Sequence, residues 1–155
     1  MIHIKHPSIE QLPALAKIFD AYRVFYKKKS NEAAAMAFLR ERIEQKESVL
    51  FVAKIKGELV GFTQLYPLFS STNMARMWLL NDLFVLPEKR ETGIGKLLMH
   101  AAQDHCKRTH SLGISLETEK SNLPGNALYP KMGFVKDGTH NFYFWENPSF
   151  SSAQS

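Results

Sequence analysis

The segment from Leu83 to Leu98 constrains the fold of this 155-residue chain more than any other part of its sequence. An apolar run ends at Val85, glycines stand at positions 93 and 95, and apolar residues then recur at helical spacing. This order predicts a strand, a tight loop and a helix that begins near Gly93. Such a loop presents successive backbone N–H groups at the positive end of the helix dipole. That arrangement favours an anion such as a pyrophosphate.

Two familiar phosphate-binding motifs do not fit this loop. The Walker motif needs Gly-Lys-Ser/Thr, but Gly95-Lys96 is followed by Leu97, and position 90 is Arg90 rather than glycine. The dinucleotide fingerprint needs a third glycine at position 98, which is a leucine. The pattern that remains is Arg-x-x-Gly-x-Gly after an apolar strand. It is compatible with a pyrophosphate loop or with a plain turn before a helix.

The rest of the sequence predicts a mixed α/β fold. Expected strands cover residues 1–5, 48–55, 58–66, 74–86, 112–117, 134–136 and 140–145, and expected helices begin near residues 9, 31, 93 and 123. The resulting order is β-α-α-β-β-β-α-β-α-β-β, a run of antiparallel hairpins followed by β-α-β crossovers. Residues 1–147 are expected to form one domain, and residues 148–155 a disordered tail.

Composition limits the classes of function. Hydrophobic residues make up 45% and charged residues 23%, which is typical of a soluble globular protein. The net charge of +5 is spread along the chain, and the Lys27–Lys29 run indicates a solvated loop rather than a nucleic-acid surface. The single cysteine, Cys106, suits a reducing compartment. With no apolar run long enough for a signal peptide or a membrane span, we expect a cytoplasmic protein. The histidine spacing on the helix from Gly93 predicts no metal site.

Two segments resemble the motifs of the GNAT N-acetyltransferase superfamily. Residues 83–98, with the loop Arg-Glu-Thr-Gly-Ile-Gly-Lys, resemble motif A. Residues 122–134, Asn-Leu-Pro-Gly-Asn-Ala-Leu-Tyr-Pro-Lys-Met-Gly-Phe, resemble motif B. The expected element order also resembles that of the superfamily from residue 1 to about 146. The resemblance implies a GNAT-like fold, whose twisted mixed sheet is splayed where CoA enters, and acetyl-CoA as co-substrate.

The resemblance also implies which residues hold the co-substrate. They are Leu83, Phe84, Val85, Arg90, Glu91, Thr92, Gly93, Ile94, Gly95, Lys96, Asn122, Asn126 and Tyr129. For the two asparagines, helix capping is an alternative role. Two departures from the superfamily pattern stand out: Glu91 replaces the usual glycine, and Pro130 lies inside the motif B helix, where it removes a hydrogen bond to residue 126.

The reaction that the resemblance implies is direct transfer of an acetyl group to a primary amine through a tetrahedral intermediate. The amine must first lose a proton, from an ammonium with a pKa of about 10. The thioester oxygen needs hydrogen-bond donors, and the departing thiolate needs a proton. Tyr129 aligns with the tyrosine that protonates the thiolate in many members of the superfamily. Its alternative role is to pack in the core.

The general base stays open between two candidates. The polyamine acetyltransferases, which this chain resembles around residues 81–85, carry a carboxylate where this chain has Asn81. An asparagine can hold a water but cannot take a proton. Asp82 is the adjacent carboxylate, but in a regular strand it faces away from Asn81 unless a bulge re-aims it. Asp82 and a chain of waters are therefore both retained.

The acceptor and the partners are the least determined features. Tyr22, Phe25 and Tyr26 lie near the end of the first helix, a region that contacts substrate in the superfamily, so they and Asn81 are expected to line the acceptor pocket; core packing is the alternative for the aromatic residues. A small-molecule amine or amino acid is expected. The alternatives are a polyamine, a protein amine, or a CoA-binding module without catalysis. The aromatic strand expected at residues 140–145 predicts a homodimer, without nucleic acid, membrane or metal.

Overall fold

The structure, a computed structural model, describes residues 1–151 and contains two compact units. Unit 1 is Met1–Glu117, and unit 2 is the chain from Thr118 onward. Of the expected disordered tail, residues 152–155 lie outside the described residues, and residues 148–151 form a turn without a regular element. The expectation of a single domain over residues 1–147 stays a prediction.

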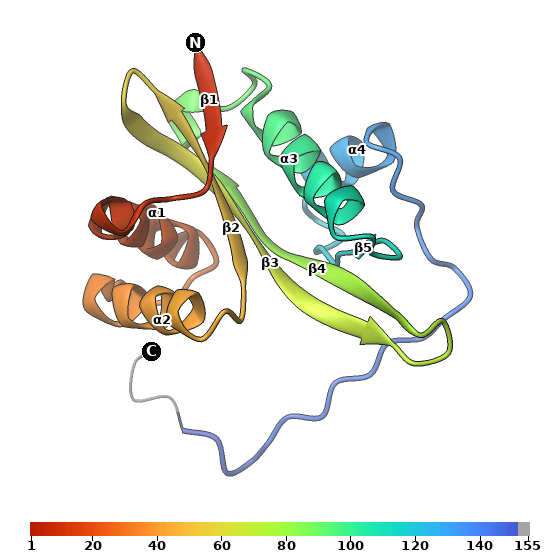
Figure 1. Cartoon of the computed structure of the whole chain (residues 1–155). Coiled ribbons are helices and arrows are strands. Elements are labelled where there is room, and N and C mark those ends of the chain that lie inside the picture. The colour runs from red at the N-terminus through yellow and green to blue at the C-terminus, as the bar shows by residue number, and fades with distance from the viewer. Residues whose placement is uncertain (152–155) are drawn as a thin grey trace. The chain divides into compact units, whose positions relative to one another are not determined.

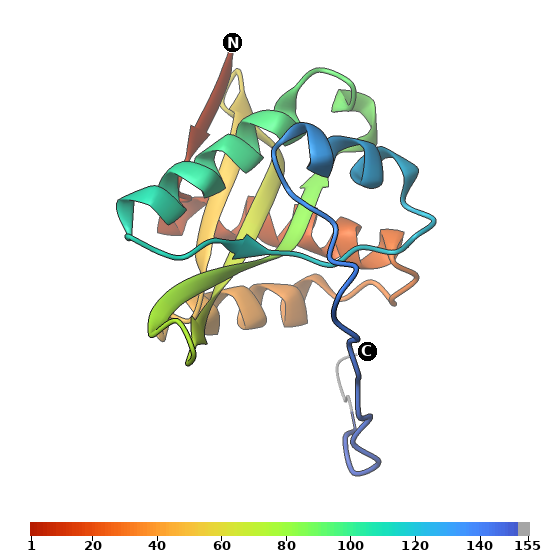
Figure 2. The same ribbon diagram turned by 90° about the vertical axis from the view of Figure 1, so that its right-hand side faces the viewer.

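A mixed five-stranded sheet forms the centre of unit 1 (Figure 1). Its strands are β1 (Ile2–Lys5), β2 (Val49–Ile55), β3 (Glu58–Ser70), β4 (Ala75–Val85) and β5 (Ile114–Ser115), and they lie side by side in that order. The first four pair antiparallel, whereas β5 runs parallel to β4. β3 runs to Ser70, beyond its expected end at residue 66, whereas β4 lies within the expected range of 74–86. The hairpin that joins them curls away from the other strands (Figure 2).

Helices cover both faces of this sheet. α1 (Leu12–Phe25) and α2 (Glu32–Glu44) lie on one face, and α3 (Ile94–Arg108) lies on the other (Figures 1 and 2). The apolar spacing that predicted α1 buries Leu15 and Phe19 in a core shared with Phe62 of β3. The mixed α/β architecture expected from the sequence is confirmed for these elements.

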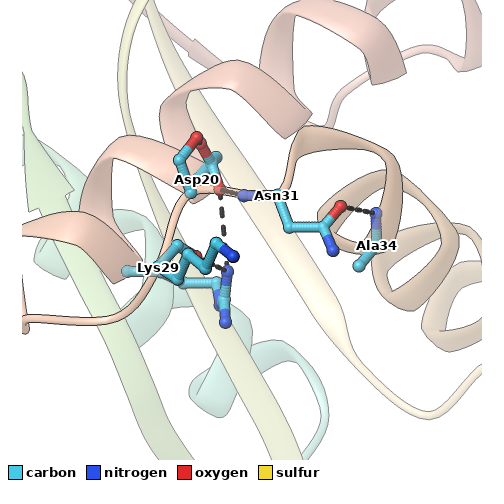
Figure 3. Close-up of polar contacts among 6 residues, drawn as sticks. Asp20, Lys29, Asn31 and Ala34 are labelled. Atoms are coloured by element: carbon cyan, nitrogen blue, oxygen red, sulfur yellow. Dashed lines mark hydrogen bonds and ion pairs between the residues drawn. The ribbon is translucent and has the colours of Figure 1, made fainter. Parts of the chain in front are cut away.

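A buried carboxylate fixes the connection between α1 and α2 (Figure 3). Asp20 is 5% exposed, and it accepts hydrogen bonds from Ser30 Oγ at 2.6 Å and from the Asn31 N–H at 2.7 Å. Asn31 in turn caps α2 by accepting from the Ala34 N–H at 3.0 Å. The Lys27–Lys29 run is exposed, as expected of a solvated loop, while these bonds set the path of the chain that leaves α1.

Unit 2 contains one helix, α4 (Leu123–Lys131), in its described part. The closing strands expected at residues 134–136 and 140–145 are not formed, and β5 spans only two residues of the expected 112–117. Aromatic residues favour extended backbone, but a strand also needs a neighbour for its N–H and C=O groups. Within the described residues of unit 2 there is no other strand to supply one.

Candidate functional site

Asn81 is the extra residue of a bulge in β4. Gln64 of β3 pairs with Asp82, and the next residue of β3, Leu65, pairs with Leu80, so Asn81 has no partner in that ladder. Two residues of one strand therefore oppose one step of the other, which is the geometry of a β-bulge. The sequence alone did not decide which way the neighbouring carboxylate, Asp82, points, and the bulge lies directly beside it.

The bulge turns Asp82 toward the face covered by α1. Two residues after Asp82, the ring of Phe84 contacts Tyr22 of α1 with centroids 5.7 Å apart. Before the bulge, the ring of Trp78 faces the opposite side and contacts His105 of α3 at 4.8 Å. In a regular strand Trp78, Asp82 and Phe84, which are separated by even numbers of residues, would all point to one face. Because Trp78 and Phe84 point to opposite faces, the bulge has re-aimed the Asp82 side chain, as the sequence allowed.

Asp82 is a buried carboxylate held by three donors. It is 4% exposed, with Gln64 Nε2 donating to Oδ2 at 2.8 Å and Asn81 Nδ2 donating to Oδ1 at 3.1 Å. Tyr22 supplies the third side-chain hydrogen bond. Burial raises the pKa of Asp82 above its ordinary value, and the three hydrogen bonds offset only part of that rise. This carboxylate therefore holds a proton up to a higher pH than an exposed one does.

Gln64 and Tyr66 belong to this site, although sequence reasoning missed them. Gln64 is fully buried, and its Nε2 also donates to Tyr66 Oη at 3.1 Å, while its Oε1 has no hydrogen-bond partner among the described residues. Burial and the negative charge of Asp82 raise the pKa of Tyr66 to about 12. The sequence did show a glutamine inside a long apolar stretch, which could have pointed to Gln64. Only the pairing register of β3 with β4, however, places that glutamine opposite Asp82.

Aromatic side chains from the end of α1 lie beside this carboxylate. Tyr22 contacts Tyr26 with ring centroids 5.1 Å apart, and Phe25 contacts Phe84 at 6.1 Å. Phe25 and Tyr26 remain 57% and 41% exposed. The structure thus brings the three expected acceptor-pocket residues of α1 together, next to Asp82, with two of them open to solvent.

Arg90 links the loop before α3 to the same aromatic group. Its Nε donates to the Val85 carbonyl at 2.9 Å. Its guanidinium lies 5.2 Å from the ring centroid of Phe25 and 5.3 Å from that of Phe84. Arg90 therefore connects the end of β4 to the end of α1, a role that the sequence did not indicate.

The start of α3 presents unpaired backbone donors. The first helical hydrogen bond runs from the Leu97 N–H to the Gly93 carbonyl, at 3.1 Å. The N–H groups of residues 94–96 precede it and have no acceptor inside the helix. Thr92 braces the preceding turn by donating from Oγ1 to the Lys89 carbonyl at 2.6 Å. These donors and the helix dipole suit a diphosphate.

The backbone at the end of β4 is open on the side of β5. Within the described part of unit 1, β5 pairs with β4 only at Trp78 and Leu79, after which the two strands separate. Residues 83–85 therefore carry backbone groups that no β5 ladder uses. The site expected for Leu83, Phe84 and Val85 is a backbone site, because the Phe84 side chain packs against α1.

Glu91 occupies the left-handed region with φ 64°, two residues before Gly93 at φ 84°. Left-handed backbone costs a residue with a side chain about 1 kcal/mol, which explains why glycine is usual here in the superfamily that the motif resembles. We expect Glu91→Gly to tighten CoA binding about fivefold, because it removes one negative charge, worth about 1 kcal/mol, from the loop expected to bind the phosphates. Calorimetric titration with CoA measures the change.

Glu91→Ala is the matched control for that substitution, since it removes the charge and keeps the backbone strain. Both variants are expected to bind CoA more tightly than the wild type, and only Glu91→Gly is expected to relieve the strain. Weaker CoA binding by Glu91→Gly would contradict the expectation that this loop binds the phosphates.

The two asparagines of the second motif are engaged within unit 2. Asn122 accepts from the Gly125 N–H at 3.2 Å, which caps α4, and donates to Thr118 Oγ1 at 2.8 Å. Asn126 donates from Nδ2 to the carbonyls of Glu119 and Asn122, at 3.0 and 2.8 Å. These contacts give both side chains a structural role in ordering the turn before α4. Their expected contacts with the co-substrate stay a prediction.

Tyr129 is half-buried in α4, with its ring 6.2 Å from that of Phe134. Pro130 follows Tyr129 in the last turn of α4, which tolerates a proline because the helix ends at Lys131. The Pro130 carbonyl accepts a hydrogen bond from the Gly133 N–H. Asp82 belongs to unit 1 and Tyr129 to unit 2, so each is described within its own unit.

No group of three or more His, Cys, Asp or Glu side chains within residues 1–151 is arranged to hold a metal ion. No helix in that range is both long and apolar enough to cross a membrane.

The sequence is similar to several known proteins. Residues 13–134 match the acetyltransferase (GNAT) family. A Bacillus subtilis protein named YhfO, described as an uncharacterized N-acetyltransferase, is 40% identical over 136 residues, which cover 88% of this chain and 91% of the relative. A Haemophilus influenzae protein described as a probable acetyltransferase is 36% identical over 101 residues, covering 64% of this chain and 69% of that protein.

Solved structures share the fold. A crystal structure of a probable acetyltransferase superposes with a TM-score of 0.90 at 32% identity, covering 96% of this chain and 99% of the other. An aminoglycoside N-acetyltransferase in complex with CoA superposes with a TM-score of 0.80 at 19% identity, covering 96% of this chain and 95% of the other. At that identity the second match shows the fold alone.

Proposed function

The chain belongs to the GNAT acetyltransferase family and is an acetyl-CoA-dependent N-acetyltransferase; from that premise we propose that its acceptor is a primary amine of a small molecule or amino acid. The observation that carries the proposal is Asp82, a buried carboxylate that a bulge turns toward exposed aromatic side chains. A carboxylate attracts an ammonium, and aromatic faces bind cations. The Asp82 carboxylate and the aromatic side chains at the end of α1 lie on the same side of β4.

In the proposed mechanism each protein group has one task. Asp82 takes a proton from the bound ammonium, and its raised pKa makes it a better base than an exposed carboxylate. The neutral amine then attacks the thioester carbonyl of acetyl-CoA. Backbone N–H groups near the end of β4 donate to the oxygen as it becomes negative. As the C–S bond breaks, Tyr129 donates its phenolic proton to the departing thiolate. The nitrogen, made positive by the new C–N bond, loses its extra proton to solvent, and the Tyr129 phenolate takes a proton back from solvent, so that the products are a neutral amide and the CoA thiol.

The charges around Asp82 favour a singly charged acceptor. The guanidinium of Arg90 packs on the aromatic group, 5.2 Å from the ring centroid of Phe25. A second positive charge on an acceptor bound at these rings would be repelled by Arg90. A polyamine is therefore less favoured than a compound with one amine.

A panel of acceptors tests this proposal. Thiol released from acetyl-CoA is measured with amino acids, small monoamines, polyamines, aminoglycosides and peptides that have a free amino terminus. We expect the highest kcat/KM with a small monoamine or an amino acid. Preference for a polyamine or peptide would replace the proposed acceptor class. Tight CoA binding without turnover of any acceptor would favour the non-catalytic alternative.

Binding of CoA is expected to stabilise the folded protein, because the loop before α3 exists only in the folded state. At a ligand concentration of about 100 times the Kd, the gain is roughly 2.7 kcal/mol. Gly93→Val should abolish the shift in Tm, since Gly93 has φ 84° and a β-branched residue does not adopt that conformation. Differential scanning fluorimetry with and without CoA measures both effects.

Gly138→Ala is the control for that experiment, because a Cβ at Gly138 meets open space. It is expected to keep the full CoA-induced shift. Circular dichroism confirms that Gly93→Val remains folded. If the Tm of the folded wild type does not respond to saturating CoA, the assignment of this loop as a CoA-binding site is wrong.

We also propose that the enzyme works in the cytoplasm as a homodimer. The one cysteine, Cys106, is a buried free thiol, 8% exposed, which suits a reducing compartment. Recovery of the protein in the soluble cytosolic fraction of its cells tests the location. Light scattering tests the assembly, with an expected mass of about twice 17.7 kDa.

A further inference from the structure

Two neighbouring residues of β3 hold Asp82 at two separate points. Thr63 Oγ1 donates to the Asp82 carbonyl at 2.8 Å, and Gln64 Nε2 donates to Asp82 Oδ2 at 2.8 Å. Both of these β3 side chains are completely buried, with exposed fractions of 0%. The first bond holds the backbone of Asp82, and the second holds its carboxylate.

The bond to the carboxylate matters because Asp82 follows a bulge. In a regular strand the pleat sets the direction of every side chain. Asn81, however, is the extra residue of the bulge and has no partner in the β3 ladder. The direction of the next side chain therefore depends on the contacts that the side chain itself makes. Gln64 Nε2 lies closer to the Asp82 carboxylate than Asn81 Nδ2 does, at 2.8 Å against 3.1 Å.

The amide of Gln64 is itself held in place by Tyr66. Besides the bond to Asp82, Gln64 Nε2 donates to Tyr66 Oη at 3.1 Å. An amide nitrogen carries two N–H groups, and here one is directed to the carboxylate and the other to the phenol. With both donors used, the amide is fixed in the orientation that presents its nitrogen to Asp82.

Packing alone does not account for a glutamine at position 64. Its Oε1 is buried and has no hydrogen-bond partner among the described residues. A buried acceptor without a partner destabilises the folded state, whereas an apolar side chain of similar length does not carry that cost. What the glutamine contributes is therefore its nitrogen, which donates to Asp82 and Tyr66.

We propose that Gln64 is a positioning residue for acetyl transfer: anchored by Tyr66, its Nε2 holds the Asp82 carboxylate in the direction, and in the charged form, that takes the proton of the acceptor amine. This role rests on the proposed function, in which Asp82 is the base. Gln64 acts through Asp82 and not on the reacting atoms. Because its N–H stabilises the charged carboxylate, it opposes the rise that burial causes in the pKa of Asp82.

The other ionisable groups around the carboxylate keep their charge state while Asp82 titrates. Two of them are phenols, Tyr22 of α1 and Tyr66 of β3, and phenols ionise well above the range of a carboxylate. The two cations are Arg42 of α2, which acts on Tyr66, and Arg90, which packs on the neighbouring rings; guanidinium groups stay protonated. A change in the acidic limb of kcat/KM therefore reports on Asp82.

Gln64→Met tests the role, because methionine keeps the length of the side chain and removes Nε2. Loss of this donor disfavours the charged carboxylate, so the acidic limb of kcat/KM should move to higher pH. At a fixed pH on that limb, kcat/KM should fall roughly tenfold, the effect expected of one hydrogen bond to a charged group. The plateau at high pH should fall less. Gln45→Met makes the same change at an exposed glutamine and is the matched control.

Tyr66→Phe is a second variant, which removes only the hydroxyl that accepts from Gln64 Nε2. It should move the acidic limb in the same direction by a smaller amount. In a Gln64→Met background it should have no further effect on the limb, since Tyr66 acts on Asp82 through Gln64. Additive shifts of the limb would contradict this order of contacts.

Carbon-13 NMR tests the role of Gln64 without acetyl transfer. Aspartate is labelled at its side-chain carboxyl carbon, and the resonance that is missing from Asp82→Asn belongs to Asp82. With no substrate present, the titration midpoint of this resonance should lie at higher pH in Gln64→Met than in the wild type or Gln45→Met. Circular dichroism checks that each variant is folded.

Two outcomes separate a failure of this proposal from a failure of the proposed function. An unchanged Asp82 midpoint in folded Gln64→Met would overturn the role of Gln64, whatever the activity of the enzyme. An acidic limb that persists in Asp82→Asn would instead overturn the assignment of Asp82 as the base.

Discussion

Asp82→Asn is expected to lower kcat by roughly 10²- to 10⁴-fold with an accepted amine, the range for loss of a positioned general base. Asparagine keeps the size of the side chain and still accepts the hydrogen bond that Gln64 Nε2 donates at 2.8 Å, but it does not take a proton. The measurement is steady-state kcat at saturating acetyl-CoA, so that weaker binding is not read as slower chemistry. Asp104→Asn is the matched control, since Asp104 is an exposed carboxylate on α3.

The same substitution is expected to leave the protein folded near neutral pH. Burial raises the pKa of Asp82 in the folded state, so its contribution to stability is full below the unfolded pKa and is lost as pH rises through the folded pKa. Asparagine does not ionise and avoids that loss. A Tm close to the wild-type value at pH 7, with reduced kcat, separates a catalytic role from a structural one. Wild-type kcat in a folded Asp82→Asn would leave a chain of waters as the base.

Tyr129→Phe is expected to lower kcat by roughly 10²- to 10⁴-fold, about 3 to 5 kcal/mol in the barrier. The substitution keeps the ring, which lies 6.2 Å from Phe134, and removes only the hydroxyl. CoA binding and Tm should therefore stay close to those of the wild type. The rate is measured with the best acceptor at saturating concentrations of both substrates.

Tyr143→Phe is the control for Tyr129→Phe, because it makes the same chemical change at an exposed tyrosine. It is expected to retain wild-type kcat. If Tyr129→Phe also turns over at the wild-type rate, Tyr129 has a packing role in α4 and another group protonates the thiolate.

The sequence predicted those features that short stretches of chain determine by themselves. The helix starts expected near residues 9, 31 and 93 appear close to those positions, with Asn31 capping α2 and Gly93 turning the chain into α3. Each depends on residues within about one helical turn, so neighbouring residues suffice to specify it.

Features that depend on strand pairing were harder to predict from the sequence. Whether Asp82 or Asn81 faces α1 depends on the register with Gln64, which is 18 residues away in sequence. The closing strands were expected from their aromatic residues, but composition does not supply a neighbouring strand. Strand pairing depends on residues that are far apart in the chain. The local pattern of residues 140–145 therefore indicated a preference for strand but did not determine the conformation that these residues adopt.

The pH dependence of kcat/KM tests the central claim most directly, namely that Asp82, re-aimed by the bulge at Asn81, takes the proton of the acceptor. For the wild type, kcat/KM should rise with pH through an apparent pKa above the ordinary range of an aspartate, because burial raises the pKa of Asp82. The profile of Asp82→Asn should lack this acidic limb. An identical acidic limb in both proteins would contradict the assignment of Asp82 as the base.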